Sequence, residues 1–133
     1  MGDATGGKPR ILAIDDEVDF TDMLKQYFEM RNYEIDVVSE GNKGLDLFHE
    51  KKYDIVLLDL KMVGLNGDEV MKKMKEADPD IRTIFITAFS DAGRTKTRLL
   101  EEGAFAYIEK PLSSLKDLED LINKAMKAKN GGR

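Results

Sequence analysis

Five short runs of apolar residues recur along the chain, and amphipathic stretches lie between them. The runs cover residues 11–14, 35–38, 55–58, 84–87 and 104–108. They are mostly rich in β-branched or aromatic residues, which is typical of strands. Three of them are almost uniformly apolar rather than alternating, as expected for parallel strands covered on both faces.

The stretches between these runs carry the spacing of three and four residues that indicates amphipathic helices. The first such set is Phe20, Met23, Leu24, Tyr27 and Met30. The last set is Leu115, Leu118, Ile122 and Ala125. Two shorter helices are predicted around Leu45 with Phe48 and around Val70 with Met74. We expect the methionines on these faces to fill the core.

Residues 91–102 form the weakest predicted helix, because Gly93, Thr95 and Thr97 are poor helix formers. Gly103 follows as a candidate C-cap. Strands and helices therefore alternate, with room for one helix in each connection. Right-handed crossovers then predict an α/β fold, a doubly wound five-stranded parallel sheet in a flavodoxin-like three-layer α/β/α sandwich.

Composition limits the function classes. The 133 residues include 21 positive and 26 negative side chains, a net charge of −5, which argues against direct nucleic-acid binding and docking on anionic membranes. Cysteine is absent, so disulfides and thiolate chemistry are excluded. The longest stretch without a charged residue, 83–90, is too short to span a bilayer. We expect a cytoplasmic protein.

The two ends of the sequence are rich in glycine. We expect a flexible leader at residues 1–9, one domain at residues 10–127 and a flexible tail at residues 128–133. The leader has no apolar core and does not resemble a signal peptide. No residues remain after the last helix for an output domain, so we expect a stand-alone regulator or a fragment of a longer one.

Acidic residues follow two of the predicted strands. Asp15 and Asp16 come directly after the first strand, and Asp59 comes directly after the third. Ligands of open α/β sheets bind beyond the carboxyl ends of the strands. In a sheet of order 2-1-3-4-5 the first and third strands are neighbours, about 4.8 Å apart, so the three carboxylates converge. Mg2+ suits such a cluster, although Asp16 alone could simply cap the following helix.

Two other polar residues close the remaining strands. Thr87 ends the fourth strand, and Lys110 follows the fifth, just before Pro111. Each has an ordinary reading, as a strand-end threonine and a solvated lysine. Together with the carboxylates they predict an anion site that forms once a metal is bound, because lysine suits phosphate.

This set of residues resembles the receiver domain of two-component response regulators. The matching elements are Asp15-Asp16, Asp59 within the sequence LLDLKM, Thr87-Ala88 and Lys110-Pro111. The similarity extends roughly from residue 10 to residue 127. One departure is Val63, where the family usually has proline, and which puts the rigidity of that loop in question.

The resemblance implies a role for each matching residue. Asp59 would accept a phosphoryl group, and Asp16 and Asp59 would ligate Mg2+ directly. The backbone carbonyl of Lys61 would add a third protein ligand, and Asp15 would act through water. Lys110 would pair with the phosphoryl group, and Thr87 would hydrogen-bond to it. Such domains often have a cis Lys–Pro bond.

The resemblance also implies partners and a signalling route. The phosphoryl donor would be a sensor histidine kinase or a histidine phosphotransfer protein, and the recipient a downstream protein target or output domain. A phosphorylation-dependent homodimer is a further expected assembly. Thr87 and Tyr107 would act as the switch, changing the surface of the fourth helix, fifth strand and fifth helix. The alternative is an edge-strand Tyr107 with one fixed rotamer.

Two other classes of protein fit the sequence less well than a receiver domain. A metal-dependent phosphatase of the haloacid-dehalogenase type needs Asp two residues after the nucleophile, where this chain has Lys61, and a substrate cap. A flavodoxin-like nucleotide or flavin protein needs a phosphate-binding loop after the first strand, where this chain has DDE. The single histidine, His49, and the basic clusters at Lys72-Lys73 and residues 94–98 indicate solvated helix faces.

Overall fold

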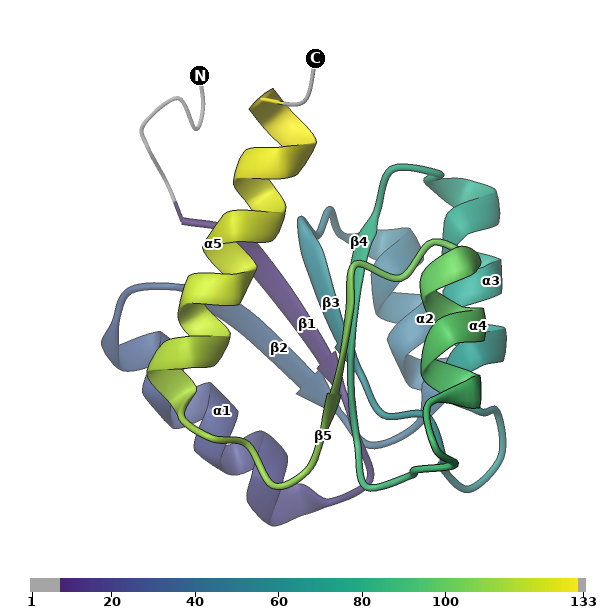
Figure 1. The fold of residues 1–133 in the computed structure, drawn as a ribbon. Helices are drawn as coiled ribbons and strands as arrows, with labels where there is room; N and C mark the ends of the chain where they lie inside the picture. The colour runs from purple at the N-terminus through teal and green to yellow at the C-terminus, as the bar shows by residue number, and fades with distance from the viewer. Residues whose placement is uncertain (1–7, 132–133) are drawn as a thin grey trace.

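The computed structural model of the protein describes residues 8–131. Strands and helices alternate along the chain (Figure 1). Their bounds are β1 (Arg10–Ile14), α1 (Val18–Met30), β2 (Glu34–Val38), α2 (Gly41–Glu50), β3 (Ile55–Leu58), α3 (Gly67–Ala77), β4 (Arg82–Thr87), α4 (Arg94–Glu101), β5 (Ala106–Glu109) and α5 (Leu115–Gly131). No helix within residues 8–131 has the length and apolar character that crossing a membrane requires.

The five strands form one parallel sheet in the order β2-β1-β3-β4-β5, which confirms the predicted topology. The register places Ile14 beside both Val38 and Leu58. On the other half of the sheet it places Thr87 beside Glu109. The carboxyl ends of all five strands therefore lie along one edge.

Alternate residues of each strand face opposite sides of the sheet, and each side has its own apolar core. Ile11 and Ala13 of β1 face the side that α1 and α5 cover. Leu12 and Ile14 face the side covered by α2, α3 and α4. Figure 1 shows these two helical layers on either side of the sheet. The strands are almost uniformly apolar because both of their faces are buried.

Several predicted details of the helices differ in the structure. Met30 in α1 is 78% exposed and Met23 is 39% exposed, so neither fills the core as expected. Phe28 is fully buried in their place, with Leu24. Leu24 and Phe28 are four residues apart, so this narrower stripe faces the sheet and the two methionines fall outside it.

The structure describes the predicted ends of the chain only in part. The helix α5 continues to Gly131 and so extends into the range 128–133, which the sequence predicted as a flexible tail. Lys8, in the predicted leader, donates a hydrogen bond of 2.7 Å to the carbonyl of Arg31. Residues 1–7 and 132–133 of the leader and tail lie outside the described part of the chain.

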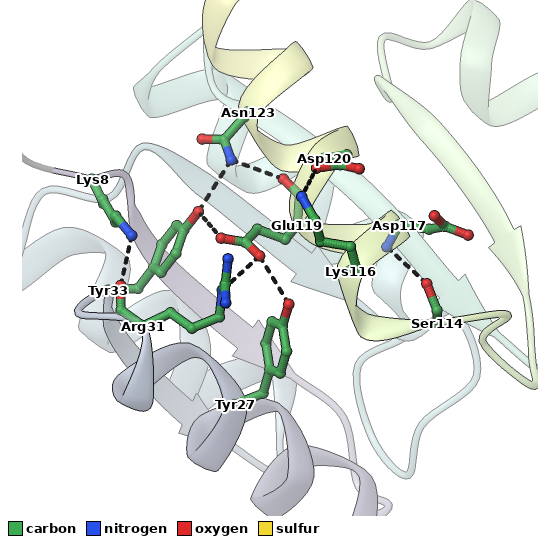
Figure 2. A network of polar contacts seen from close by, with 10 residues as sticks. All are labelled: Lys8, Tyr27, Arg31, Tyr33, Ser114, Lys116, Asp117, Glu119, Asp120 and Asn123. Atoms are coloured by element: carbon green, nitrogen blue, oxygen red, sulfur yellow. Dashed lines mark hydrogen bonds and ion pairs between the residues drawn. The ribbon is translucent and has the colours of Figure 1, made fainter.

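A buried carboxylate joins α5 to the end of α1 (Figure 2). Glu119 is 4% exposed and accepts hydrogen bonds from the hydroxyls of Tyr27, at 2.9 Å, and Tyr33, at 2.8 Å. Nε of Arg31 forms an ion pair of 2.7 Å with the same carboxylate. Burial opposes its charge, but the bonds from Arg31, Tyr33 and Tyr27 lower the pKa of Glu119 to about 2.

Candidate functional site

Backbone hydrogen bonds continue past the strands and place the polar residues that follow them. The amide of Asp15 donates to the carbonyl of Val38 at 3.1 Å. The amide of Asp59 likewise donates to Ile14 at 3.0 Å. The amide of Lys110 donates to Thr87 at 2.8 Å. These residues therefore leave the sheet in register at the same edge, as the strand-end argument predicted.

The three predicted carboxylates meet at this edge. Asp15, Asp16 and Asp59 each offer an oxygen, and these oxygens lie within 4.8 Å of one another. Asp15 and Asp59 are buried, at 3% and 7% exposure, whereas Asp16 is exposed. Asp16 does not cap α1, because the N-cap residue is Glu17 and no side-chain capping bond is present. The carboxylate of Asp16 is therefore not used in capping and is available to a cation.

The electrostatics of the cluster show why a cation would stabilise it. Burial raises the pKa of Asp59, and the neighbouring charge of Asp15 raises it further. Burial also raises the pKa of Asp15, against the hydrogen bonds that it accepts from the Glu17 amide and from Lys110. An oxygen-seeking divalent cation would offset both effects, and Mg2+ binds through one or two carboxylates while it keeps several waters.

Lys110 brings a positive charge directly beside the carboxylates. Its ammonium forms ion pairs with Asp15, at 2.9 Å, and with Glu17, at 2.7 Å. It also lies 4.4 Å from the centre of the Phe20 ring. Desolvation lowers the pKa of Lys110, but the two carboxylates outweigh it and the net shift is upward. The Lys110–Pro111 peptide bond is cis.

Thr87 and Tyr107 are connected through the segment that follows β4. Thr87 is 1% exposed, and its hydroxyl oxygen accepts a hydrogen bond of 3.2 Å from the amide of Phe89. The carbonyl of Phe89 accepts one of 2.8 Å from the hydroxyl of Tyr107. Tyr107 is 8% exposed, so its ring points into the protein. The two residues predicted as a switch are thus linked through a single backbone residue.

The segment after Asp59 depends on close backbone packing. A methyl group on Gly67 would collide with the carbonyl of Asp59, so only glycine fits there. The amide of Gly67 donates to the carbonyl of Leu60 at 2.8 Å. Val63 is 87% exposed, and the next residue, Gly64, takes the left-handed conformation with φ of 85°. Valine therefore occupies the usual proline position without any packing restraint.

These residues surround one pocket of about 350 Å3. The side chains and backbone that line it belong to Asp15, Asp16, Glu17, Asp59, Lys61, Thr87, Ala88, Phe89 and Lys110. The ammonium of Lys61 lies 4.8 Å from the centre of the Phe89 ring and closes one side. The pocket combines oxygen ligands, a cation and a hydroxyl, which suits an anion held beside a metal.

Sequence reasoning missed four residues of this site, which are Glu17, Phe20, Gly67 and Phe89. Glu17 and Phe20 follow the acidic pair closely, but nothing in the sequence shows that both contact Lys110. The position of Gly67, directly after Asn66 and at the start of α3, was a signal from which its role could have been predicted. The other conspicuous residues stay outside the site, since His49, Lys72 and Lys73 are exposed and Arg98 pairs with Asp68 and Glu102.

The comparisons with known proteins agree with this geometry. Residues 11–123 match the model of the response regulator receiver domain. The chain belongs to the receiver domain family. It is 30% identical to the sporulation initiation phosphotransferase F of Bacillus subtilis over 121 residues, covering 91% of this chain and 96% of that protein. The family match favours the receiver domain over the two other classes considered from the sequence.

Solved receiver domains share the whole fold. A CheY-like receiver domain protein from Methanospirillum hungatei superposes with a TM-score of 0.87 at 26% identity, covering 94% of this chain and 98% of that one. The response regulator TrrA from Thermotoga maritima, solved in complex with Mg2+–BeF, gives 0.76 at 31% identity, covering 89% and 99%. Several curated relatives are longer, and this receiver domain spans 24% to 47% of their length.

Proposed function

We propose that this receiver domain is a phosphorylatable switch in which Asp59 accepts a phosphoryl group in the presence of Mg2+. The observation that supports this most directly is the convergence of Asp15, Asp16 and Asp59 within 4.8 Å, with the ammonium of Lys110 beside them. A buried acceptor, acidic neighbours and one cation are the groups that phosphoryl transfer requires, because it depends on positioning and charge neutralisation.

The metal ligands would be the carboxylates of Asp16 and Asp59 and the backbone carbonyl of Lys61, with Asp15 acting through water. A bound Mg2+ supplies charge neutralisation for the crowded carboxylates and for the phosphoryl oxygens. The exposure of Asp16 fits this role, since Mg2+ keeps several waters and needs an open side.

The reaction would be an in-line displacement at phosphorus. A carboxylate oxygen of Asp59 attacks the phosphorus of a phosphohistidine, the P–N bond breaks, and the imidazole takes a proton from water and leaves as neutral histidine. The product is an acyl phosphate on Asp59. Water later attacks the phosphorus, and inorganic phosphate is released as the Asp59 carboxylate is restored. Lys110 would pair with the new phosphoryl oxygens, and Thr87 would donate its hydroxyl to them.

The donor would be a histidine kinase or a histidine phosphotransfer protein, and the domain would act as a phospho-acceptor in signalling in the cytoplasm rather than as a turnover enzyme. The recipient would be a protein target or an output domain. Movement of Thr87 toward the phosphoryl group would pull on Phe89, which also holds Tyr107. The signal would then leave through the surface of α4, β5 and α5.

Intact-mass measurement tests the acceptor. The chain is incubated with a small phosphodonor, with and without Mg2+, and we expect one added phosphoryl group only when Mg2+ is present. Asp59→Asn should abolish the addition, whereas Asp46→Asn, on the exposed face of α2, should not. Stoichiometric labelling of the Asp59→Asn variant at another carboxylate would contradict the assignment.

A further inference from the structure

The ammonium of Lys110 has three N–H bonds, and three partners surround it. They are Oε1 of Glu17 at 2.7 Å, Oδ2 of Asp15 at 2.9 Å and the face of the Phe20 ring at 4.4 Å. All three lie in the β1–α1 connection or in the first turn of α1. The ammonium of Lys110 is therefore turned toward α1.

The carboxylate of Asp59 is not one of these three partners of Lys110. Within residues 8–131, no ion pair or hydrogen bond joins Lys110 to Asp59, although Lys110 acts on its pKa through space. The group that would have to meet the phosphoryl oxygens is thus held by other residues before any phosphoryl group is present. Forming the phosphorylated state requires Lys110 to exchange at least one partner.

Glu17 is the partner that can be exchanged most easily. Its side chain is 59% exposed, whereas that of Asp15 is 4% exposed. Releasing an exposed carboxylate to water costs little, but leaving a buried one unpaired costs much more. Glu17 also has no competing task in its own helix, because its side chain makes no capping bond to α1.

We propose that Glu17 is a positioning residue that holds the Lys110 ammonium toward α1 and releases it when a phosphoryl anion forms on Asp59. This inference rests on the proposed function. Glu17 competes with the phosphoryl group for one cation, so it weakens the phosphorylated state relative to the free one. The strength of this exposed pair sets the size of the effect, about two- to fivefold in affinity for a phosphoryl analogue.

The first test needs no ligand. The unfolding equilibrium of the parent chain is compared with those of Glu17→Gln, Lys110→Met and the double variant in a double-mutant cycle. We expect a favourable coupling of about two- to fivefold in the unfolding constant. The Lys110 ammonium resonance, followed by NMR in the parent and in Glu17→Gln, should shift as well. An absence of coupling together with an unshifted resonance would overturn the inference.

The second test uses Mg2+ with fluoroberyllate as the phosphoryl analogue. At saturating Mg2+, Glu17→Gln should bind it about two- to fivefold more tightly than the parent chain. The matched control is Asp19→Asn, which removes the same charge from an exposed position in the first turn of α1. Among residues 8–131 the ion pairs of Lys110 are with Asp15 and Glu17 and not with Asp19. An equal gain in both variants would show a general charge effect and overturn the positioning role.

The two tests separate the inference from the proposed function. If the parent chain fails to bind fluoroberyllate with Mg2+, the proposed function is wrong, and the ligand-free coupling still decides whether Glu17 holds Lys110. If the parent binds and Glu17→Gln binds no better, the proposed function stands and the Glu17 inference is overturned.

Discussion

The hydroxyl of Tyr107 donates a hydrogen bond to the backbone carbonyl of Phe89, two residues beyond Thr87. The ring of Tyr107 also packs against Phe85, with 6.3 Å between ring centres. The tyrosine is thus held inward by the segment that follows β4. A change at Thr87 would reach Tyr107 through one backbone residue.

We therefore expect a phosphoryl analogue to change more than the Asp59 pocket. In NMR spectra of the parent chain with Mg2+ and fluoroberyllate, the signals of Tyr107 and of residues 91–102 should shift. Tyr107→Phe keeps the ring but removes the bond to Phe89, so it should lower the free energy of unfolding by about 1 kcal/mol and reduce the shifts in residues 91–102. Shifts confined to the pocket would rule the coupling out.

Removing one metal ligand should separate metal binding from folding. Mg2+ at a hundred times its Kd would raise the free energy of unfolding by about 2.7 kcal/mol through mass action. Asp16→Ala should lose this gain and most of the phosphorylation, with little cost without metal because Asp16 is exposed. Thermal unfolding with and without Mg2+ measures this gain in stability. The control is Asp22→Ala, on the exposed face of α1. An unchanged Mg2+ response in Asp16→Ala would mean that the metal lies elsewhere.

Gly67→Ala should disturb the segment after Asp59 sterically. The added methyl group meets the backbone carbonyl of Asp59, which cannot rotate aside as a side chain could. We expect a loss of about 1–3 kcal/mol in the free energy of unfolding and slower phosphorylation. Gly64→Ala provides the contrast, since its position is open and only the positive φ opposes alanine. Urea unfolding of Gly67→Ala that matches the parent chain would contradict the packing argument.

The Glu119 network should make stability depend on acidic pH. The pKa of Glu119 in the folded chain is about 2, against 4.5 for an ordinary glutamate. Its stabilisation is therefore fully present above pH 4.5 and is lost as the pH falls toward 2. Protonation of Glu119 would lower the free energy of unfolding by roughly 3 kcal/mol at most.

Glu119→Gln should remove this part of the pH dependence and lower the free energy of unfolding at neutral pH. Denaturant unfolding measured at several pH values between 2 and 7 would test this. The free energy of unfolding should change less with pH in the variant than in the parent chain. Asp120→Asn is the control, because Asp120 is the next residue along α5 and is 60% exposed in its pair with Lys116. Profiles of equal slope for Glu119→Gln and the parent would refute the role of the network.

The sequence predicted the sheet well because parallel strands buried on both faces leave a plain apolar signal. It was less accurate where side chains outside the strands decide the structure. The helix predicted at residues 91–102 begins only at Arg94, since the Asp91 carboxylate accepts bonds from both the amide and the hydroxyl of Thr95. Ala92 and Gly93 take positive φ values there, which a helix does not allow.

The residues of the site were likewise predictable from the strands, whereas their side-chain contacts were not. Asp15, Asp16, Asp59, Thr87 and Lys110 were predictable, because each ends or follows a strand and strand ends share an edge. The contacts of Lys110 were not predictable in that way. They depend on which way one long side chain turns, and the choice of Glu17 and Phe20 over Asp59 is visible only in three dimensions.

The bonds around Glu119 bear on how this domain can move. Rotation of α5 about its own axis would pull the Glu119 carboxylate away from Arg31, Tyr27 and Tyr33. A buried charge would then be left without a partner, which is costly. The helix α5 is thus fixed in place by Tyr27 of α1 and by Arg31 and Tyr33, which follow α1. We therefore expect α4, a short helix that follows two residues of positive φ, to move more readily than α5.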